Sequence, residues 1–335
     1  MANNKKITIA VDAMGGDNAP GEICKGAIEA CKKFSDIEII LTGDEFKIQS
    51  CLKNFKTSSQ IRVVHTTEII QPDEHPALAI RKKKNSSMRV AMEMVRSGEA
   101  QGFVSAGSTG AIVAGGVLVV GRLSGIDRPA LGVMLPVIDR PSFMLDVGAT
   151  VRCSPENLLQ FALMGNIYSR KILKVANPEI KLLSNGSENI KGDETVLGAR
   201  ELIRKRENLN FQGYIEGNDI VWGNADVIVS DGFSGNIALK MGEGVVQGLK
   251  SLLTDEVRKS FMAKAGLLLM SGVVKKLWTR FNYEKYGGSA LLGVNGAVIK
   301  AHGRSKAPAI VSAISVARDF VDEDGAQLIR NEIQE

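Results

Sequence analysis

The chain has 335 residues, of which 44% are hydrophobic and 24% are charged, and it carries a formal net charge of +5 at pH 7. This composition is typical of a globular protein and excludes a disordered or fibrous chain. The excess of positive charge suits acidic partners, but it is too small to indicate nucleic-acid binding. The four cysteines and three histidines show no metal-ligand spacing, so we expect no metal centre.

Segments with the pattern of strands alternate with segments with the pattern of helices along the chain. The expected strands cover 7–12, 37–42, 61–65, 102–105, 131–136, 143–147, 180–183, 227–230 and a pair within 291–300. The expected helices begin near Pro20 and then cover 46–55, 77–97, 110–123, 155–171, 194–206, residues from about 236 onward, and 308–322. This alternation predicts an α/β fold, a three-layer α/β/α sandwich with a mainly parallel sheet. We expect a single domain over residues 1–335, which can form two lobes around a cleft.

The sequence gives no sign of export or of a membrane span. The N-terminal residues lack the apolar core of a signal peptide, and the apolar run 265–274 is too short to cross a bilayer. We therefore expect a cytoplasmic protein.

Five loops rich in Gly, Asn, Ser or Asp follow five of the expected strands. They are 12–20, 105–111, 146–150, 184–192 and 230–236. Open α/β sheets bind ligands at the carboxyl ends of their strands, and glycine-rich loops that lead into helices turn N–H groups toward anions. A tight turn or a helix cap explains any one of these glycines equally well. Five such loops together favour one shared polar cleft suited to phosphate or another oxyanion.

Standard nucleotide and hydrolase motifs fail on inspection. The segment 116–123 ends in Arg-Leu, where a Walker A loop needs Lys-Ser or Lys-Thr. The glycines within 242–248 have one spacer residue too many for the dinucleotide fingerprint. The segment 232–235 lacks the second spacer of a nucleophile elbow. The sequence therefore supports neither a nucleotide site nor a serine triad.

Taken together, these loops resemble the PlsX family, the phosphate:acyl-carrier-protein acyltransferases. The motifs that carry the resemblance are Asp-Ala-Met-Gly-Gly-Asp at 12–17, Ser-Ala-Gly-Ser-Thr-Gly at 105–110, Arg-Pro-Ala at 128–130, Asp-Val-Gly-Ala at 146–149, Asp-Gly-Phe-Ser-Gly-Asn at 231–236, Tyr-Gly-Gly at 286–288 and Ile-Lys-Ala-His-Gly at 299–303. Their order and spacing match from about residue 7 to about residue 330. Thr150 and Ser184 depart from the residues that the family usually has there.

The resemblance implies a fold like that of phosphotransacetylase and isopropylmalate dehydrogenase, usually in a homodimer. It implies that acyl-[acyl-carrier-protein] and inorganic phosphate give acyl phosphate and free carrier protein, without a cofactor. It also implies that a membrane glycerol-3-phosphate acyltransferase then uses the acyl phosphate for phospholipid synthesis.

Phosphate is already a nucleophile and a thioester is already activated, so the site has to position them and stabilise an oxyanion. The resemblance points to Lys191 and Asn236 as catalytic residues that neutralise or donate to that oxyanion. His302 either positions the substrate or protonates the departing thiol, and a buried, hydrogen-bonded histidine is the alternative. The expected substrate- and phosphate-binding residues are Asp12, Gly15, Gly16, Asp17, Ser105, Gly107, Ser108, Thr109, Asp231, Ser234 and Gly235. For the three aspartates, a role in holding the loops together is the favoured interpretation.

Residues 249–283 have the pattern of an amphipathic helical hairpin. An apolar stripe with a spacing of four runs from Leu249 to Ala265, and a second runs from Val273 to Phe281. Basic side chains surround the apolar tip at 266–272, as in segments that lie on anionic lipid. The residues expected to contact the membrane are Leu267, Leu268, Leu269, Lys275, Lys276 and Trp278. We therefore expect peripheral association with the inner face of the cell membrane, while a dimer-forming hairpin is an alternative that can hold at the same time.

The basic run Arg81–Lys84 is a docking candidate for the acidic carrier protein, although such a run is also typical of a solvated helix face. Three other functions stay open at this point. They are a phosphotransacetylase acting on coenzyme A thioesters, a dehydrogenase of the isopropylmalate type, and a non-catalytic membrane scaffold. The five polar loops argue against the scaffold, and the absence of clustered metal-binding aspartates in the sequence argues against the dehydrogenase.

Overall fold

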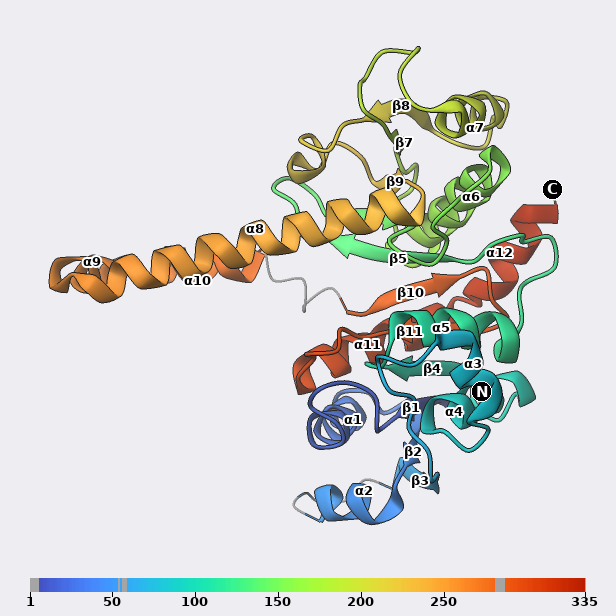
Figure 1. The fold of residues 1–335 in the computed structure, drawn as a ribbon, viewed down its shortest axis with the longest axis vertical. Helices are drawn as coiled ribbons and strands as arrows, with labels where there is room; N and C mark the ends of the chain where they lie inside the picture. The colour runs from blue at the N-terminus through green and yellow to red at the C-terminus, as the bar shows by residue number, and fades with distance from the viewer. Residues whose placement is uncertain (1–5, 54, 56–58, 281–286, 335) are drawn as a thin grey trace.

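The computed structural model describes residues 6–53, 55, 59–280 and 287–334. Its strands form one sheet with helices on both faces, as the sequence predicts (Figure 1). The order across the sheet is β3-β2-β1-β4-β11-β10-β5-β6-β9-β7-β8. The strands are β1 (Ile7–Asp12), β2 (Ile37–Gly43), β3 (Ile61–His65), β4 (Gly102–Ser105), β5 (Ala130–Leu135), β6 (Ser142–Leu145), β7 (Ile180–Leu183), β8 (Phe211–Ile215), β9 (Val227–Val229), β10 (Ser289–Leu292) and β11 (Ala297–Lys300).

The helices connect the strands and cover the sheet. They are α1 (Gly21–Lys33), α2 (Glu45–Leu52), α3 (Pro76–Lys82), α4 (Ser87–Ser97), α5 (Thr109–Gly115), α6 (Pro155–Lys171), α7 (Glu194–Arg204), α8 (Gly232–Lys259), α9 (Phe261–Leu269), α10 (Ser271–Arg280), α11 (Ala307–Asp322) and α12 (Gly325–Gln334). A π-helical turn, η1 (Gly116–Val120), continues α5, and a short 3-10 helix, η2 (Ile220–Trp222), precedes β9.

The sheet contains two blocks of parallel strands that run in opposite directions. β3, β2, β1, β4 and β11 are parallel to one another, and so are β6, β9, β7 and β8. Between the blocks, the pairs β11–β10, β10–β5 and β5–β6 are each antiparallel. The direction therefore reverses three times, so the carboxyl ends of the two blocks point in opposite directions along the sheet.

Side chains alternate between the two faces of each strand, and each face has its own apolar core. Val11, Val104 and Ile299 belong to the core that also contains residues of α1, α6 and α11. On the opposite face, Phe103 and Val298 pack with residues of α4, α5 and η1. Helices therefore cover both faces, which explains why the central strands are apolar throughout.

Several elements differ from the sequence prediction. Residues 77–97 form two helices instead of one because Ser86 is extended (φ −79°, ψ 144°) and pairs as a single bridge with Glu68. β8 and α12 were not predicted at all. The helix expected from about residue 236 already begins at Gly232, since the Asp231 side chain caps it.

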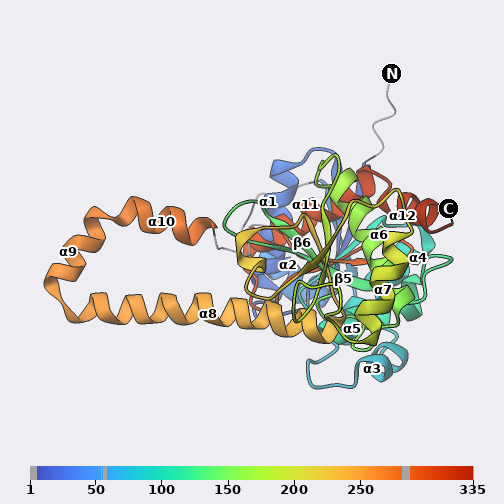
Figure 2. The same cartoon turned by 90° about the horizontal axis from the view of Figure 1, so that it is seen from above.

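Helices α8, α9 and α10 form an arm that projects from the sheet (Figures 1 and 2). The arm differs from the predicted hairpin because α9 occupies most of the segment expected to be the tip loop. The chain bends at Ser260, which is extended and whose side chain caps α9 at the N–H of Ala263. Residues 281–283 of the expected hairpin, and with them Phe281, lie outside the described residues. No described helix is both long and apolar enough to span a bilayer.

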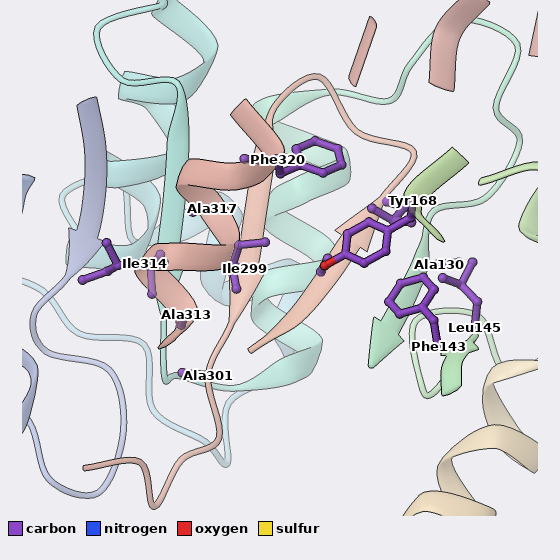
Figure 3. Packing of buried hydrophobic residues seen from close by; sticks show 14 of the residues in the cluster. Ala130, Phe143, Leu145, Tyr168, Ile299, Ala301, Ala313, Ile314, Ala317 and Phe320 are labelled. Carbon is purple, nitrogen blue, oxygen red and sulfur yellow. The ribbon is translucent and has the colours of Figure 1, made fainter. Parts of the chain in front are cut away.

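Phe143 offers a test of the core around the second block. Its side chain is 1% exposed, and its ring stacks on Tyr168 with centroids 4.2 Å apart (Figure 3). We expect Phe143→Ala to lower the free energy of unfolding by about 3–5 kcal/mol, because it leaves a cavity. Phe46, which is 85% exposed, provides the control, and Phe46→Ala should change stability by less than about 0.5 kcal/mol. Urea denaturation measures both, and equal losses would contradict this description of the core.

Candidate active site

A first cluster of predicted site residues forms where β1, β4 and β11 end. The carboxyl of Asp12 and the hydroxyl of Ser105 are both buried, and Ser105 Oγ donates to Asp12 Oδ2 at 2.7 Å. The N–H of Met14 donates to the other oxygen of Asp12, and the N–H of Gly107 donates to Ser105 Oγ. Burial raises the pKa of the Asp12 carboxyl, while these hydroxyl and N–H donors act in the opposite direction. The pair therefore fixes the 12–17 loop against the 105–110 loop.

Two glycines of this cluster are required by close contacts. A Cβ at Gly15 would lie 2.5 Å from Asp12 Oδ2 and 2.9 Å from the Gly107 nitrogen. Gly16 has φ +97°, which side chains rarely tolerate. The next residue, Asp17, is exposed, and its N–H donates to the Gly303 carbonyl at 2.8 Å. The conformation of the first loop thus depends on both the second loop and the segment after β11.

The second loop leads into a helix with an open start. Ser108 is the N-cap residue of α5, but its side chain makes no capping hydrogen bond to the first turn. The N–H groups of a first helical turn have no partners within their helix, so here they stay available to solvent or to a ligand. Ser108 and Thr109 are half-buried, and their hydroxyls add further donors. This is the best match in the described residues to the predicted anion-binding loop.

A second cluster forms where β6 and β9 end, around the buried carboxyl of Asp146. Backbone N–H groups of four residues donate to it, at distances from 2.7 to 3.1 Å; they belong to Leu131, Gly148, Ala149 and Thr150. Burial raises the pKa of the Asp146 carboxyl and these donors oppose the shift. Ser230 Oγ donates to the Asp146 carbonyl at 2.9 Å. Asp146 therefore organises this cluster as Asp12 organises the first.

Thr150 keeps its loop in place despite its departure from the family pattern. Its hydroxyl donates to the carbonyl of Pro129, in the Arg-Pro-Ala motif, at 3.1 Å. Its carbonyl accepts the N–H of Gly232 at 2.9 Å. The threonine thus ties three of the sequence motifs together.

The first turn of α8 is capped by a side chain, unlike that of α5. The Asp231 side chain accepts the N–H groups of Phe233 and Ser234, and its carbonyl accepts that of Gly235. A Cβ at Gly235 would lie 1.9 Å from the Asp146 carbonyl oxygen, so only glycine fits there. Asp231 is therefore an N-cap, the buttressing role favoured for it from the sequence. The side chain of Asn236 is exposed and lies beside Gly148.

Lys191 lies in a third group, the 184–192 loop after β7. Its N–H donates to the Glu188 carbonyl at 3.0 Å, and its stem passes beside Gly186. Gly192 donates its N–H to Asn185 Oδ1, which closes the loop. In the described part of the chain, the Lys191 ammonium has neither a hydrogen-bond partner nor a carboxylate within 4 Å, and it makes no such contact with either cluster.

The strand directions do not place all five loops at one edge of the sheet. The loops after β1 and β4 lie at the carboxyl end of one block, whereas those after β6, β7 and β9 lie at the carboxyl end of the opposite block. Strand direction alone therefore does not bring the five loops together, because the antiparallel strands β10 and β5 reverse the sheet between the blocks. One shared cleft stays a prediction. A connection comes instead from α8, which starts in the second cluster.

Two residues of α8 act on the end of β11. Lys240 and Glu243, which pair with each other at 2.7 Å, both influence the titration of Lys300 and His302. The pKa of His302 is lowered, first by burial and then by the charge of Lys300. Its Nδ1 accepts the N–H of Arg304 at 3.2 Å. A neutral imidazole in this state presents Nε2–H as a donor, which suits positioning better than proton transfer to a thiol.

Sequence reasoning missed Lys240, Glu243 and Lys300 as members of the site. A charged residue in a helix or at the end of a strand has no distinctive pattern by itself. The one signal was the position of Lys300 inside the Ile-Lys-Ala-His-Gly motif. Tyr286, in another of the motifs, lies outside the described residues.

Solved structures of phosphotransacetylases have this fold. One from Streptococcus pyogenes aligns over 97% of this chain and 94% of its own length, with a TM-score of 0.63 and 17% identity. The EutD phosphotransacetylase from Staphylococcus aureus aligns over 97% and 95%, with a TM-score of 0.62 and 15% identity. The chain thus has the same α/β fold as these phosphotransacetylases, as the resemblance implied.

The sequence comparisons are more specific. A family model described as "Fatty acid synthesis protein" matches residues 7–328. A protein of Heliobacterium modesticaldum named "Phosphate acyltransferase" is 48% identical, over 98% of both chains. Another with the same name, from Geobacillus thermodenitrificans, is 47% identical over 98% of this chain and 99% of its own. The chain therefore belongs to the PlsX family, as its motifs predicted.

Asp146 and Asp44 together test the role of the buried carboxyl. Both side chains accept backbone N–H groups, but Asp146 is buried while the Asp44 side chain is 34% exposed. We expect Asp146→Ala to lower the free energy of unfolding by about 3 kcal/mol or more, because buried donors lose their acceptor. Asp44→Ala removes only the N-cap of α2 and should cost about 1 kcal/mol. Equal losses in chemical denaturation would show that Asp146 does not organise its cluster.

Proposed function

We propose that this protein transfers an acyl group from acyl carrier protein to inorganic phosphate, and so forms acyl phosphate and free carrier protein. The observation that carries the proposal is the family match over residues 7–328, together with relatives of nearly equal length named phosphate acyltransferases. The coenzyme A phosphotransacetylases are the alternative, since their fold is the same.

The chemistry needs no covalent enzyme intermediate. A phosphate oxygen attacks the thioester carbon, the carbonyl oxygen becomes an oxyanion, and the C–S bond breaks as the sulfur leaves and takes up a proton. The enzyme has to hold the two reactants in contact and stabilise the oxyanion. Donors without a fixed partner suit that task, and the site offers them in the open start of α5 and in the ammonium of Lys191.

We assign a role to each group of predicted residues on this basis. Ser105, Gly107, Ser108 and Thr109 form the phosphate loop, and Asp12 and Asp17 hold it in place with Gly15 and Gly16. Lys191 and Asn236 stabilise the oxyanion. Asp231, Ser234 and Gly235 fix the start of α8, and His302 positions the substrate.

Lys191 and Asn236 provide the direct test. Wild-type protein is incubated with palmitoyl-acyl carrier protein and phosphate, with palmitoyl-coenzyme A in parallel, and acyl phosphate is trapped as its hydroxamate. We expect product from the carrier protein, and about 10²–10³-fold slower turnover in Lys191→Ala and in Asn236→Ala, the loss typical of a missing oxyanion donor. Lys205→Ala, an exposed lysine at the end of α7, should turn over normally.

The outcomes separate the two candidate activities. If wild-type protein makes no acyl phosphate from the carrier protein, the proposed function is wrong. Activity with the coenzyme A thioester alone would identify a phosphotransacetylase. Full activity in both alanine variants would leave the function standing and remove these two residues from the catalytic site.

The arm supports a proposal about assembly and location. Apolar side chains along α8 follow one another at every fourth position, and each is at least 43% exposed; they are Phe233, Ile237, Met241, Val245, Leu249 and Leu253. A soluble monomer rarely exposes so long a row. We assign this row to the contact between two copies of the chain.

The tip of the arm carries a different surface. Leu268 and Leu269 are 75% and 88% exposed, and Lys275 and Lys276 are exposed near them, whereas Leu267 and Trp278 are half-buried. Leucines beside lysines suit the surface of an anionic membrane. The protein would then be cytoplasmic and peripherally attached to the inner face of the cell membrane, where a membrane glycerol-3-phosphate acyltransferase takes up the acyl phosphate.

A docking site for the carrier protein is proposed at the end of α3. Arg81, Lys82 and Lys84 are exposed there. Lys83 is not available, because its ammonium pairs with Glu74 at 2.6 Å and donates to the Ile69 carbonyl. Three exposed cations thus remain to attract an acidic partner.

Vesicle binding tests the tip. We expect the double variant Leu268→Glu, Leu269→Glu to bind anionic phosphatidylglycerol vesicles at least about tenfold more weakly. Two leucine side chains that enter the bilayer surface contribute several kcal/mol of apolar transfer free energy. Phe46→Glu changes an equally exposed apolar side chain on α2 and should bind as wild type does. Cosedimentation measures binding, and sedimentation equilibrium checks that both variants keep the wild-type assembly. Unchanged binding of the double variant would remove the tip from the membrane contact.

A further inference from the structure

Lys300 lies in a row of polar residues across the sheet. In the pairing of β11 with β4, Lys300 is in register with Ser105, which itself donates its hydroxyl to Asp12. Paired residues of neighbouring parallel strands point to the same face, so the Lys300 side chain leaves the sheet on the face of Ser105 and Phe103. The backbone continues the contact, because the N–H of Ala301 donates to the Ser105 carbonyl at 2.8 Å. Lys300 is thus built into the edge of the first cluster.

The ammonium of Lys300 lacks a counterion of its own. In the described residues, no carboxylate lies within 4 Å of it, although its side chain is half-buried. Burial lowers its pKa, and the like charge of Lys240 lowers it further, while Glu243 raises it. Glu243 is already paired with Lys240 at 2.7 Å. A half-buried cation without a partner still costs free energy, and such a group is typical of a site that binds an anion.

Helix α8 carries Asn236, one of the expected catalytic residues, and two charged residues that influence Lys300. Asn236, Lys240 and Glu243 are spaced four and three residues apart on α8, so they share one face of that helix. Two of them, Lys240 and Glu243, act electrostatically on Lys300. The nearby residues Ala238 and Leu239 of α8 pack against the core on the face of the sheet from which Lys300 projects. Asn236 lies one turn back from Lys240, about 6 Å along the helix axis. Asn236 therefore lies on the same side of α8 as the two residues that influence the pKa of Lys300.

The charged residues near the end of β11 come from several elements. Asp12 belongs to β1, Lys240 and Glu243 to α8, and His302 and Arg304 to the segment after β11. Asp12 is occupied by hydroxyl and N–H donors. Asp17 adds a second carboxylate beside Glu243, since its Oδ1 would lie 3.7 Å from a Cβ at Gly303. Lys240, Lys300 and Arg304 are the cationic side chains that these two carboxylates face.

We propose that Lys300 is an anion-binding residue of the active site, whose ammonium contacts inorganic phosphate before the transfer and acyl phosphate after it. The inference rests on the proposed function for the identity of the anion, but phosphate binding can be measured without turnover. Lys300 then links the strand-end loops of the first cluster to the α8 face that carries Asn236.

The primary test is phosphate binding to the full chain without an acyl donor. A ³¹P NMR titration measures this binding. We expect Lys300→Met to weaken phosphate binding about tenfold or more, the usual effect of losing a charged hydrogen bond. In steady-state assays the KM for phosphate should rise by the same factor while the KM for the acyl carrier protein stays unchanged. Lys300→Arg should restore most of the affinity. Lys181→Met, a half-buried strand lysine of β7, should bind phosphate as wild type does.

Two further readouts separate binding from a structural role. Lys300→Met removes a buried charge, so its melting temperature should stay equal or rise while its phosphate affinity falls. In wild type, phosphate binding needs the charged ammonium, so affinity should decline as pH rises through the lowered pKa of Lys300. That decline should disappear in Lys300→Arg, because a guanidinium stays charged.

The outcomes are distinct. Wild-type phosphate affinity in a folded Lys300→Met variant would overturn the proposal, and so would an equal loss in Lys181→Met. If wild-type protein binds phosphate more tightly than Lys300→Met but makes no acyl phosphate, Lys300 is an anion-binding residue and the proposed function is wrong.

Discussion

The architecture of the site depends on a buried carboxyl that gathers backbone donors at the end of a strand. This arrangement occurs twice, with Asp12 at the end of β1 and with Asp146 directly after β6. In each case a serine at the end of the neighbouring strand completes the arrangement, Ser105 in the first and Ser230 in the second. A carboxyl without these donors would be too costly to bury, so each aspartate dictates the path of its loop.

The clusters around Asp12 and Asp146 differ in which N–H donors lack an acceptor. Around Asp146, the carboxyl takes up the loop donors and Asp231 takes up those of α8, so this cluster is internally complete. Around Asp12, the donors at the start of α5 remain open. The first cluster is therefore suited to binding an anion, whereas the second is suited to holding the start of α8 rigidly. Rigidity there matters because α8 holds Asn236 beside Gly148 and continues into the projecting arm (Figure 1).

Local pattern made much of this predictable. Strands β3, β4 and β7 and helix α6 have the predicted bounds, since each is a short apolar or amphipathic segment with clear breaks. The family motifs also identified the strand-end loops. The reversal of the sheet was out of reach, because it depends on how β10 and β5 pair across long separations in sequence. The split at Ser86 likewise depends on its bridge to Glu68, a contact that no local pattern reports.

Asp12 and Asp231 hold their loops, the role favoured for them from the sequence, whereas Lys300 was not singled out there. Asp12 and Asp231 stand in the most recognisable motifs, yet their oxygens are taken up by N–H and hydroxyl donors of the fold. A reaction between a phosphate dianion and a developing oxyanion has no use for further negative charge near the reacting atoms. It needs cations and amide donors whose partners are missing in the resting protein. Lys191, Asn236 and Lys300 meet that requirement in the described residues, which is why the chemistry is proposed for them.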